Sequence, residues 1–543
     1  MNVTTNTILG WLPDSDGLEP LNAESAKTKL GQLDKALFVA KSGDDLLLAT
    51  DRQLTGQEAD EASLPAIAYV PPVRPQSLGD ASFCADHRVA YAYVGGSMAN
   101  GISSVETVVA LGRSGLLGFF GAAGRPLPEV AEAIVRVRAE LGDLPFGFNL
   151  IHQPSEPSLE AATADLYVKE KVHLVETSAF LGLTLPILRY RLHGIHADPE
   201  GRIVTPNRII AKLSRVEVAE KFMSPPPAAM IAQLVADGIL TQEQALLAAR
   251  VPVAQDVTAE ADSGGHTDRR PAVCLIPTML ALRDRMQAKH QFEQPLRVGA
   301  AGGIATPSSA AAAFAMGASY IVVGSVHQCT LEAGTSQTVR EMLASTSQAD
   351  TTMAPAADMF EMGVKLQVLK RGTMFPMRAA RLYEIYREYN DLAAIPAAEL
   401  QKLEKTIFRM PLADVWADTQ RFFNERDPSQ LQRAAEDPRH KMALVFRWYL
   451  GQASRWANCG TSGRQIDYQV WCGPAMGAFN EWVHGTFLQS VEARSILLVA
   501  KNLLFGAALL VRANVLAQQG IGLSAEWIGA VPRTLAEIEE NGG

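Results

Sequence analysis

The chain has 543 residues, which is longer than a single domain of ordinary size and predicts about two structural units with extensions. Hydrophobic residues make up 48% of it, enough for a large core. The formal net charge of −9 and the lack of any run of Lys and Arg exclude nucleic-acid binding through a basic surface.

Cysteine usage indicates a reducing compartment. The five cysteines form no CxxC pair, and their odd number argues against a disulfide framework. They are Cys84, Cys274, Cys329, Cys459 and Cys472. We expect no metal site.

Residues 1–6 lack the basic region followed by an apolar run that marks a secretory signal, so we expect a cytoplasmic protein.

Residues 1–85 form the first expected unit. The strand-like runs 36–40 and 46–50 precede a proline-rich connector at 71–75. Nothing catalytic is recognisable there, so we expect a small cap packed on the unit that follows.

From residue 86 to 350 strands alternate with glycine-bearing turns and amphipathic helices, the pattern of a parallel α/β fold. Eight strands in about 250 residues match a (β/α)8 barrel of the TIM type. The expected strands are 89–94, 116–120, 146–150, 173–177, 208–213, one that begins at Asp256, 296–303 and 320–325. The expected helices between them include 105–114, 128–141 and 308–316.

Two regions exceed the repeat. Residues 223–250 contain two helical segments, 228–237 and 241–249, with Thr241 as an N-cap, and we expect this inserted pair to lean over the barrel mouth. Residues 351–543 are helix-rich and are expected to form an additional α-helical domain. Their most apolar stretch, 496–511, contains Lys501 and Asn502 and is too short to span a membrane, so it is expected to be a buried helix.

Two glycine turns at strand ends suggest a phosphate site. Gly302-Gly303 and Gly324-Ser325 end the last two expected strands, where unobstructed backbone N–H groups of a barrel bind phosphate. The alternative is two ordinary turns in which glycine supplies a permissive φ. One strand earlier on the same face, the loop 260–268 presents His266, and this favours a cofactor site.

These motifs resemble a known group of enzymes. Ser263-Gly-Gly-His266, Ala300-Ala-Gly-Gly-Ile304 and Val323-Gly-Ser325 are similar to the flavin-dependent barrels that include nitronate monooxygenases and bacterial enoyl-acyl-carrier-protein reductases. The segment 175–180, the loop 260–268 and the tail resemble, more narrowly, the PfaD family of trans-acting enoyl reductases.

The resemblance implies FMN and NADPH as cofactors. It implies reduction of the 2,3 double bond of enoyl thioesters on acyl carrier protein domains of a polyketide or polyunsaturated fatty acid synthase, and it leaves a homodimer open. The alternative is a nitronate monooxygenase. The long helical C-terminal region favours the reductase, because a carrier-protein substrate needs a docking surface and a small nitroalkane does not.

Flavin binding in such a barrel needs small residues under the ring, polar groups at its edge and the phosphate turns. Asn149 is expected at the ring edge, with a strand-end turn residue as the alternative. Lys212 is expected near the ring or, equally, paired with Glu176 or Glu260. The expected cofactor-binding residues are Gly95, Gly96, Ser97, Met98, Asn149, Lys212, Gly264, Gly265, Ala301, Gly302, Gly303, Gly324 and Ser325.

His266 is the expected catalytic residue. It can donate a hydrogen bond to the thioester oxygen as the enolate develops, or deliver the proton to the α-carbon, and the sequence leaves both roles open. Glu176 and Ser178, two positions apart, are expected to support Lys212 or His266 without contacting the ligand themselves.

An acidic carrier protein would need a local basic face on this acidic chain. The candidates are Arg433, Arg439, His440, Lys441, Arg447, Arg455 and Arg464. The alternative is that these residues belong to ordinary solvated helix faces.

Overall fold

The structure, a computed structural model, describes residues 8–13, 17–56, 63–154 and 156–543. Residues 1–7, on which the expectation of no secretory signal rests, lie outside this description. Within it, eight parallel strands close into the predicted barrel, with β16 paired to β6. In chain order they are β6 (Tyr93–Gly95), β7 (Leu117–Phe120), β8 (Gly147–Ile151), β9 (Leu174–Ser178), β12 (Arg208–Leu213), β13 (Asp256–Glu260), β15 (Arg297–Ala301) and β16 (Ile321–Val323).

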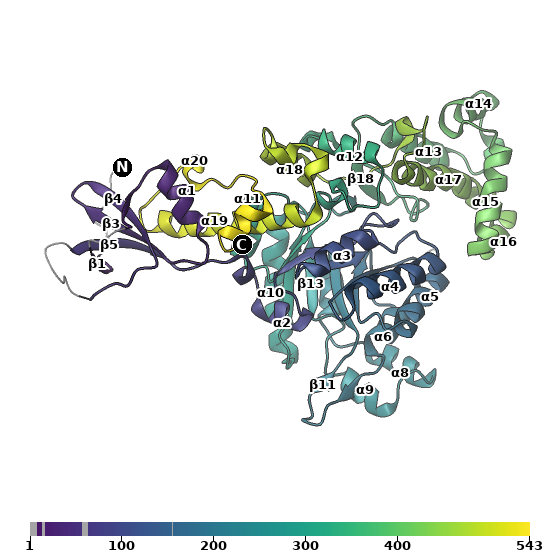
Figure 1. The fold of residues 1–543 in the computed structure, drawn as a ribbon. Coiled ribbons are helices and arrows are strands. Elements are labelled where there is room, and N and C mark those ends of the chain that lie inside the picture. Colours follow the sequence, from purple (N-terminus) through teal and green to yellow (C-terminus); the bar gives the residue numbers. More distant parts are fainter. Residues whose placement is uncertain (1–7, 14–16, 57–62, 155) are drawn as a thin grey trace.

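The barrel strands are buried apolar runs because helices cover the outside of the barrel (Figure 1). These helices are α3 (Val105–Arg113), α4 (Leu127–Leu141), α5 (Pro157–Lys169), α6 (Leu185–Leu192), α7 (Val216–Phe222), α10 (Ala272–His290) and α11 (Pro307–Ala315). The predicted helices 105–114, 128–141 and 308–316 are confirmed within one residue at each end.

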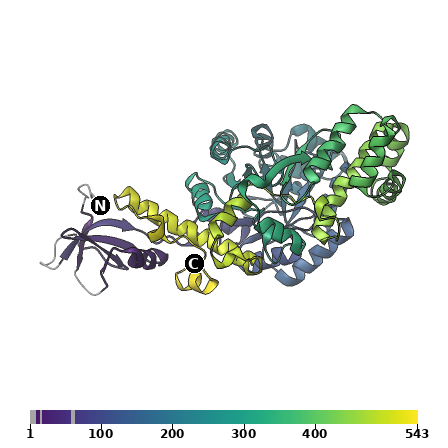
Figure 2. The same cartoon turned by 90° about the horizontal axis from the view of Figure 1, so that it is seen from above.

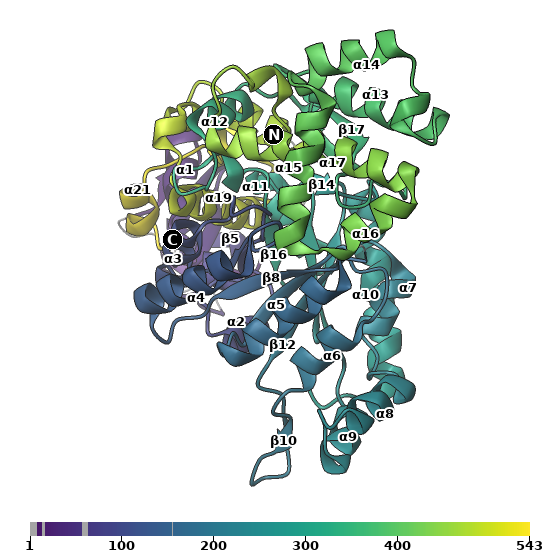
Figure 3. The same ribbon diagram turned by 90° about the vertical axis from the view of Figure 1, so that its right-hand side faces the viewer.

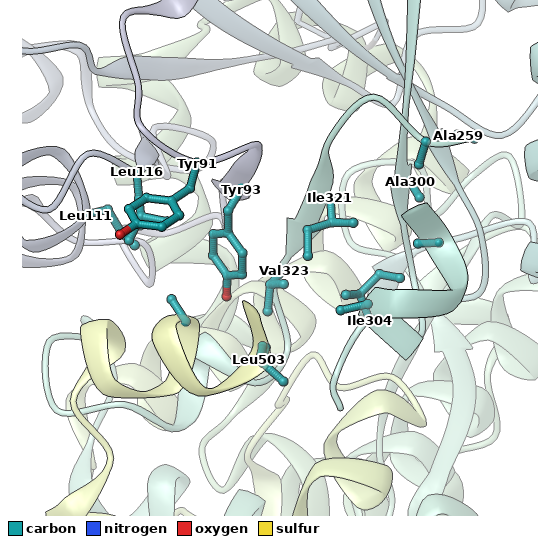
Figure 4. Close-up of a cluster of buried hydrophobic side chains, with 14 of the residues drawn as sticks. Tyr91, Tyr93, Leu111, Leu116, Ala259, Ala300, Ile304, Ile321, Val323 and Leu503 are labelled. Carbon is teal, nitrogen blue, oxygen red and sulfur yellow. The ribbon is translucent and has the colours of Figure 1, made fainter. Parts of the chain in front are cut away.

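The eighth covering helix comes from the far end of the chain. Helix α19 (Ile496–Gln518), the predicted buried apolar helix, packs against α11 and α3 and so fills the place after β16. A side chain at Gly506 would come within 2.5 Å of Pro307 Cγ, so glycine permits this close contact. Leu503 of α19 joins the core beside Val323 (Figure 4). Although α19 has the length and composition of a membrane-spanning helix, 72% of its most apolar window is buried within the protein.

The amino end of the barrel is closed by α2 (Ala81–His87) through a buried ionic network. Arg297 forms two hydrogen bonds to Asp256, at 2.6 and 3.1 Å, and His87 Nε2 lies 2.9 Å from the same carboxylate. Arg297 and Asp256 are buried, and Asp86 provides a second acid for Arg297 at 2.7 Å. This network holds α2 against the first residues of β13 and β15.

The inserted pair α8 (Ala228–Ala236) and α9 (Gln242–Ala248) lies at the amino end of the barrel, so its predicted position over the mouth is wrong (Figure 3). The pair follows α7 and therefore belongs to the connection from a helix to the next strand. Such connections lie at the amino ends of the barrel strands, opposite the mouth. Its two ends meet just before β13, where Ala254 N–H donates to Phe222 O at 2.8 Å. Thr241 caps α9 as predicted, in a capping box. The hairpin β10 (His196–Ala197) and β11 (Ile203–Val204) lies beside the pair.

The N-terminal unit is a five-stranded antiparallel sheet at the far end of α19 (Figure 2). Its strand order is β1 (Gly10–Pro13), β5 (Ser63–Val70), β3 (Leu37–Ser42), β4 (Asp45–Thr50) and β2 (Glu19–Pro20), with α1 (Ala23–Gly31) packed beside it. Strand β5 and α1 contact α19, and Arg512 donates to Lys35 O at 2.8 Å. The sheet is therefore tied to the barrel through α19.

The region after residue 351 is helix-rich, as predicted, and also contains two strands. Strands β17 (Thr351–Pro355) and β18 (Lys365–Leu369) join β14 (Gly265–His266) in one antiparallel sheet over the barrel mouth. The helices that follow β16 include α12 (Gln337–Ala344), α13 (Phe375–Glu388), α14 (Ala397–Leu403), α15 (Leu412–Arg426), α16 (Ser429–Glu436), α17 (Pro438–Cys459) and α18 (Ala475–Val483). Helices α13, α15 and α17 share a core of their own with β17 and β18.

Two short helices end the chain, α20 (Ala525–Ile528) and α21 (Leu535–Glu540). Both pack against α19. The expected domain limits at 85 and 350 remain a working division, because α19 continues the barrel core across the second limit.

Candidate functional site

The glycines of the two turns differ in what a side chain would meet. A side chain at Gly302 would come within 2.7 Å of the Ala261 backbone, and the φ of +84° there also favours glycine. At Gly303, which has φ +77°, and at Gly324 a Cβ atom would meet nothing within 4 Å. Because β15 and β16 are neighbours in the barrel, both turns open at the same edge. This open space with backbone donors fits a bound phosphate.

A segment far away in the sequence completes this edge. Gly473 N–H donates to Ser325 Oγ at 3.3 Å, and Cys472 N–H donates to Gln367 O at 3.4 Å. A Cβ at Gly264 would lie 3.0 Å from Cys472 backbone atoms, so Gly264 permits the contact, while one at Gly265 would meet nothing within 4 Å. We did not predict residues 471–473 at the site. The only sequence signal is the Gly473-Pro474 break before α18.

His266 lies on the short strand β14, whose partner is β18. Its side chain is 30% exposed, and its Nε2 lies 3.1 Å from Asp358 Oδ1, an acid that the sequence did not single out. Burial alone would lower the pKa of His266, but the Asp358 carboxylate outweighs burial and raises it. The Asp358 carboxylate therefore favours protonated His266, the form that can donate a proton.

Lys212 pairs with both acids that the sequence offered. Its Nζ lies 3.5 Å from Glu176 Oε2 and 3.7 Å from Glu260 Oε1. Burial opposes the charge, yet the two carboxylates raise the pKa of Lys212. Burial raises the pKa of Glu260, with the Glu176 charge adding to it and Lys212 opposing it. The interpretation of Glu176 as support for Lys212 fits this geometry.

The turn after β6 is hydrogen-bonded to Glu176. Ser97 N–H donates to Glu176 Oε2 at 2.9 Å, and the Ser97 hydroxyl also donates to it. Gly95 and Gly96 are needed for packing, since a Cβ would come within 2.3 Å of Leu111 and 2.7 Å of Val322 respectively. Met98 N–H donates to Ser103 Oγ at 3.0 Å. These hydrogen bonds hold the turn with Ser97 facing Glu176.

Asn149 is buried in the middle of β8 and joins this network. Its Nδ2 donates to Glu176 O at 3.1 Å and to Ser178 Oγ at 3.0 Å. Its Oδ1 accepts no hydrogen bond from the described part of the chain, so it can accept one from a ligand. Glu176 Oε1 is also buried without a partner among the described residues.

The predicted residues thus form one connected group at the carboxyl end of the barrel. Asn149, Ser97, Lys212 and Glu260 surround Glu176, and Glu260 and Lys212 act electrostatically on His266. Ala301 pairs with Glu260 at the end of β15 and leads into the Gly302-Gly303 turn. Across the described residues, His, Cys, Asp and Glu side chains form no cluster that could hold a metal ion.

The seven candidate docking cations do not share one free face. His440 is buried between Glu361 and Gln430, and Arg464 donates to Ile407 O and Phe408 O. Arg439 stacks over Tyr386 and Lys441 over Trp416, with 4.8 and 4.9 Å to the ring centroids. Several of these cations therefore stabilise the helical region itself.

A cavity of about 530 Å³ lies at the opposite, amino end of the barrel. Arg208, Gln255 and Gln294, which stand at or just before the first residues of three strands, line part of it. In parallel barrels the chemistry is placed at the carboxyl ends of the strands. We therefore assign the candidate site to the mouth.

Comparisons with known proteins identify the family of this chain. Residues 83–408, more than half of the chain, match the model of the nitronate monooxygenase family. Residues 389–468, which cover α14 to α17, match the inserted helical domain of [acyl-carrier-protein] S-malonyltransferase.

Two curated relatives illustrate the likeness. One of the polyunsaturated fatty acid synthase subunits of Thraustochytrium sp. is 45% identical over 505 residues, covering 92% of this chain and 33% of that protein. The polyketide biosynthesis protein PksE of Bacillus subtilis is 44% identical over 436 residues, covering 80% of this chain and 56% of PksE. The chain thus spans only part of these curated relatives.

A solved structure covers nearly the same unit. The enoyl reductase domain of MlnA, from the macrolactin biosynthesis cluster of Bacillus amyloliquefaciens, is 39% identical, with a TM-score of 0.77. The match covers 82% of this chain and 99% of that one. As the sequence motifs predicted, the chain belongs to the nitronate monooxygenase family.

Proposed function

We propose that this chain is an FMN-dependent enoyl reductase that uses NADPH to reduce the 2,3 double bond of enoyl thioesters on acyl carrier protein domains. The observation that carries the proposal is the His266–Asp358 pair at a barrel mouth that also has the open Gly303 and Gly324 turns. The relatives named for polyunsaturated fatty acid and polyketide synthesis support this substrate class. The cytoplasm remains the expected compartment.

The residues present fit a bound FMN. Gly303, Gly324 and Ser325 would hold its phosphate, while Asn149 Oδ1 and Ser97 would lie at its polar edge. Lys212 would place a positive charge in the barrel, between Glu176 and Glu260. When bound, FMN supplies transfer of a hydride that originates from NADPH.

His266 then completes the reaction. Addition of hydride to the β-carbon pushes negative charge onto the thioester oxygen, which a donor at the mouth can stabilise. Protonated His266 can donate a hydrogen bond to that oxygen or give its proton to the α-carbon. NADPH and one proton are consumed and the saturated thioester and NADP+ are formed. Asp358 raises the pKa of His266 and so favours its protonated form.

Anaerobic turnover tests the proposal. Without oxygen, protein loaded with FMN should oxidise more than one NADPH per flavin only when crotonyl carrier protein is present, and one butyryl carrier protein should form for each further NADPH oxidised. An alkyl nitronate under air serves as the comparison substrate, because the matched family is named for nitronate oxidation. Turnover of the nitronate with no reduction of the crotonyl thioester would replace the reductase by a nitronate monooxygenase.

A further inference from the structure

Residues spaced by seven on α17 mark the face of this helix that looks onto the barrel mouth. His440 Nδ1 lies 2.6 Å from Glu361 Oε1, in the turn between β17 and β18. Ser454 Oγ accepts a hydrogen bond at 2.8 Å from Asn100, in the loop after β6. Residues seven apart lie on the same side of a helix. Arg447, midway between His440 and Ser454, therefore faces the mouth.

No described residue pairs with Arg447 on this face. Within the described chain, no ion pair within 4.0 Å and no hydrogen bond joins it to another residue. Its side chain is only partly exposed, and burial lowers the pKa of its guanidinium. A partly desolvated charge that no described residue pairs is costly, so its presence at this place points to a ligand.

The acids close enough to act on Arg447 are Glu156, Glu361 and Asp358. Each already has a closer basic side chain as its partner: Arg426 lies 2.7 Å from Glu156, His440 lies 2.6 Å from Glu361, and His266 lies 3.1 Å from Asp358. Arg447 is therefore the cation of this group that remains available to an incoming anion.

There is also room beside it. Gly451 lies one turn further along α17, is exposed, and a Cβ there would meet nothing within 4 Å. A ligand that approaches His266 from the side of α17 can therefore pass Arg447 without displacing a side chain at 451.

We propose that Arg447 binds a phosphate group of a ligand that enters the barrel mouth. A guanidinium can hold phosphate through two parallel charge-assisted hydrogen bonds. The inference rests on the proposed function, which brings two such groups to the mouth: the phosphate of the carrier's phosphopantetheine arm and the 2′-phosphate of NADPH. The FMN phosphate has its own turns at Gly303 and Gly324.

The variant R447M removes the charge at similar side-chain length. R136M is the matched control, since Arg136 is half-exposed on α4, on the outside of the barrel, where it pairs with Glu106. If Arg447 binds the phosphate of the phosphopantetheine arm, R447M should raise KM for crotonyl carrier protein about tenfold or more. KM for crotonyl-N-acetylcysteamine, which has no phosphate, and for NADPH should stay as in R136M.

For the coenzyme phosphate, R447M should instead raise KM for NADPH by a similar factor, while KM for NADH and for both thioesters stays unchanged. Values within about twofold of R136M for all four ligands, in a variant that melts like R136M, would overturn the proposal. Equal loss of kcat with every ligand would also overturn it, because that pattern indicates a structural role.

Wild-type protein provides a second test that does not depend on the variant folding. Calorimetry should show about tenfold tighter binding of 4′-phosphopantetheine than of pantetheine, or of NADPH than of NADH. Equal affinities in both comparisons would overturn the phosphate role. Because this is binding rather than turnover, it remains informative if the enzyme fails to reduce crotonyl thioesters, a result that would instead contradict the proposed function.

Discussion

His266 Nε2 lies 3.1 Å from Asp358 Oδ1, although the two residues are 92 positions apart in the chain. The pairing arises because β14 and β18 join in one sheet, which carries the turn holding Asp358 over the barrel mouth. Asp358 thereby raises the pKa of His266 above its ordinary value. Asp358, in the segment that follows the barrel strands, thus favours the charged form of His266, the proposed proton donor.

Replacing Asp358 should change the pH dependence of turnover. In D358N the loss of the carboxylate lowers the pKa of His266, so the protonated form is lost at lower pH. The alkaline limb of the kcat profile for crotonyl carrier protein should therefore shift to lower pH. D350N is the control, because Asp350 pairs with Arg371 at the start of β17. Identical limbs in wild type and D358N would show that Asp358 does not tune the reaction.

Removal of His266 should separate the two half-reactions. H266A should keep FMN, because the Gly303, Gly324 and Asn149 contacts are untouched, and lose on the order of 10²-fold or more in enoyl turnover. In stopped flow, reduction by NADPH should survive far better than reoxidation by crotonyl carrier protein. Equal losses in both steps would assign His266 to folding or to coenzyme binding.

The phosphate turns can be tested by charge. In G324D a carboxylate enters space that is open in the protein, so the chain should fold while the like charge expels FMN. Gly324 is a cleaner position than Gly303, whose φ of +77° would strain any substituted residue. G182D places the same charge on the rim loop after β9 and should retain FMN. Stoichiometric FMN in purified, folded G324D would place the phosphate elsewhere.

The network at the amino end of the barrel should matter for stability. D256N leaves Arg297 and His87 without their shared buried carboxylate and should destabilise the fold by about 3–5 kcal/mol at neutral pH. E140Q, which breaks the exposed pair with Arg113, should cost less than about 1 kcal/mol. Thermal melting at pH 7 should rank the variants in this order, and equal melting of both would contradict it.

The same network predicts the direction of acid sensitivity. Burial acts to raise the pKa of Asp256, but His87 and Arg297 outweigh it and hold the pKa well below its usual range. The stabilisation is therefore present above about pH 4, the unfolded value, and is lost as pH falls toward the folded value. The melting difference between wild type and D256N should be constant from pH 7 to about 5 and shrink below about 4. If the melting difference already shrinks above pH 5, the acid sensitivity arises from a group other than Asp256.

The barrel could be predicted because each of its strands is a short apolar run ending in small or polar residues, and such runs recur with helices between them. The same regularity put Asn149, Lys212 and the Gly302-Gly303 turn at one end of the sheet. Local patterns were enough to predict these positions, because each residue is placed by the strand on which it lies or which it follows.

Contacts between distant segments could not be predicted. Asp358 and residues 471–473 reach the site only through pairing with β14, Gln367 and Ser325, and no periodicity in their own sequence marks that pairing. The predicted position of α8 and α9 is wrong because the insertion follows α7, and a connection from a helix to the next strand lies at the amino end. The role of α19 as the eighth barrel helix could not be predicted, because nothing in its own sequence indicates that it packs against α11 and α3.

The most direct test of the central claim is a single anaerobic mixing experiment with FMN-loaded protein, NADPH and crotonyl carrier protein. We predict that NADPH bleaches the yellow flavin, that crotonyl carrier protein restores its colour without oxygen, and that one butyryl thioester forms for each NADPH oxidised. A protein that cannot be loaded with FMN, or a reduced flavin that crotonyl carrier protein leaves bleached, would contradict it.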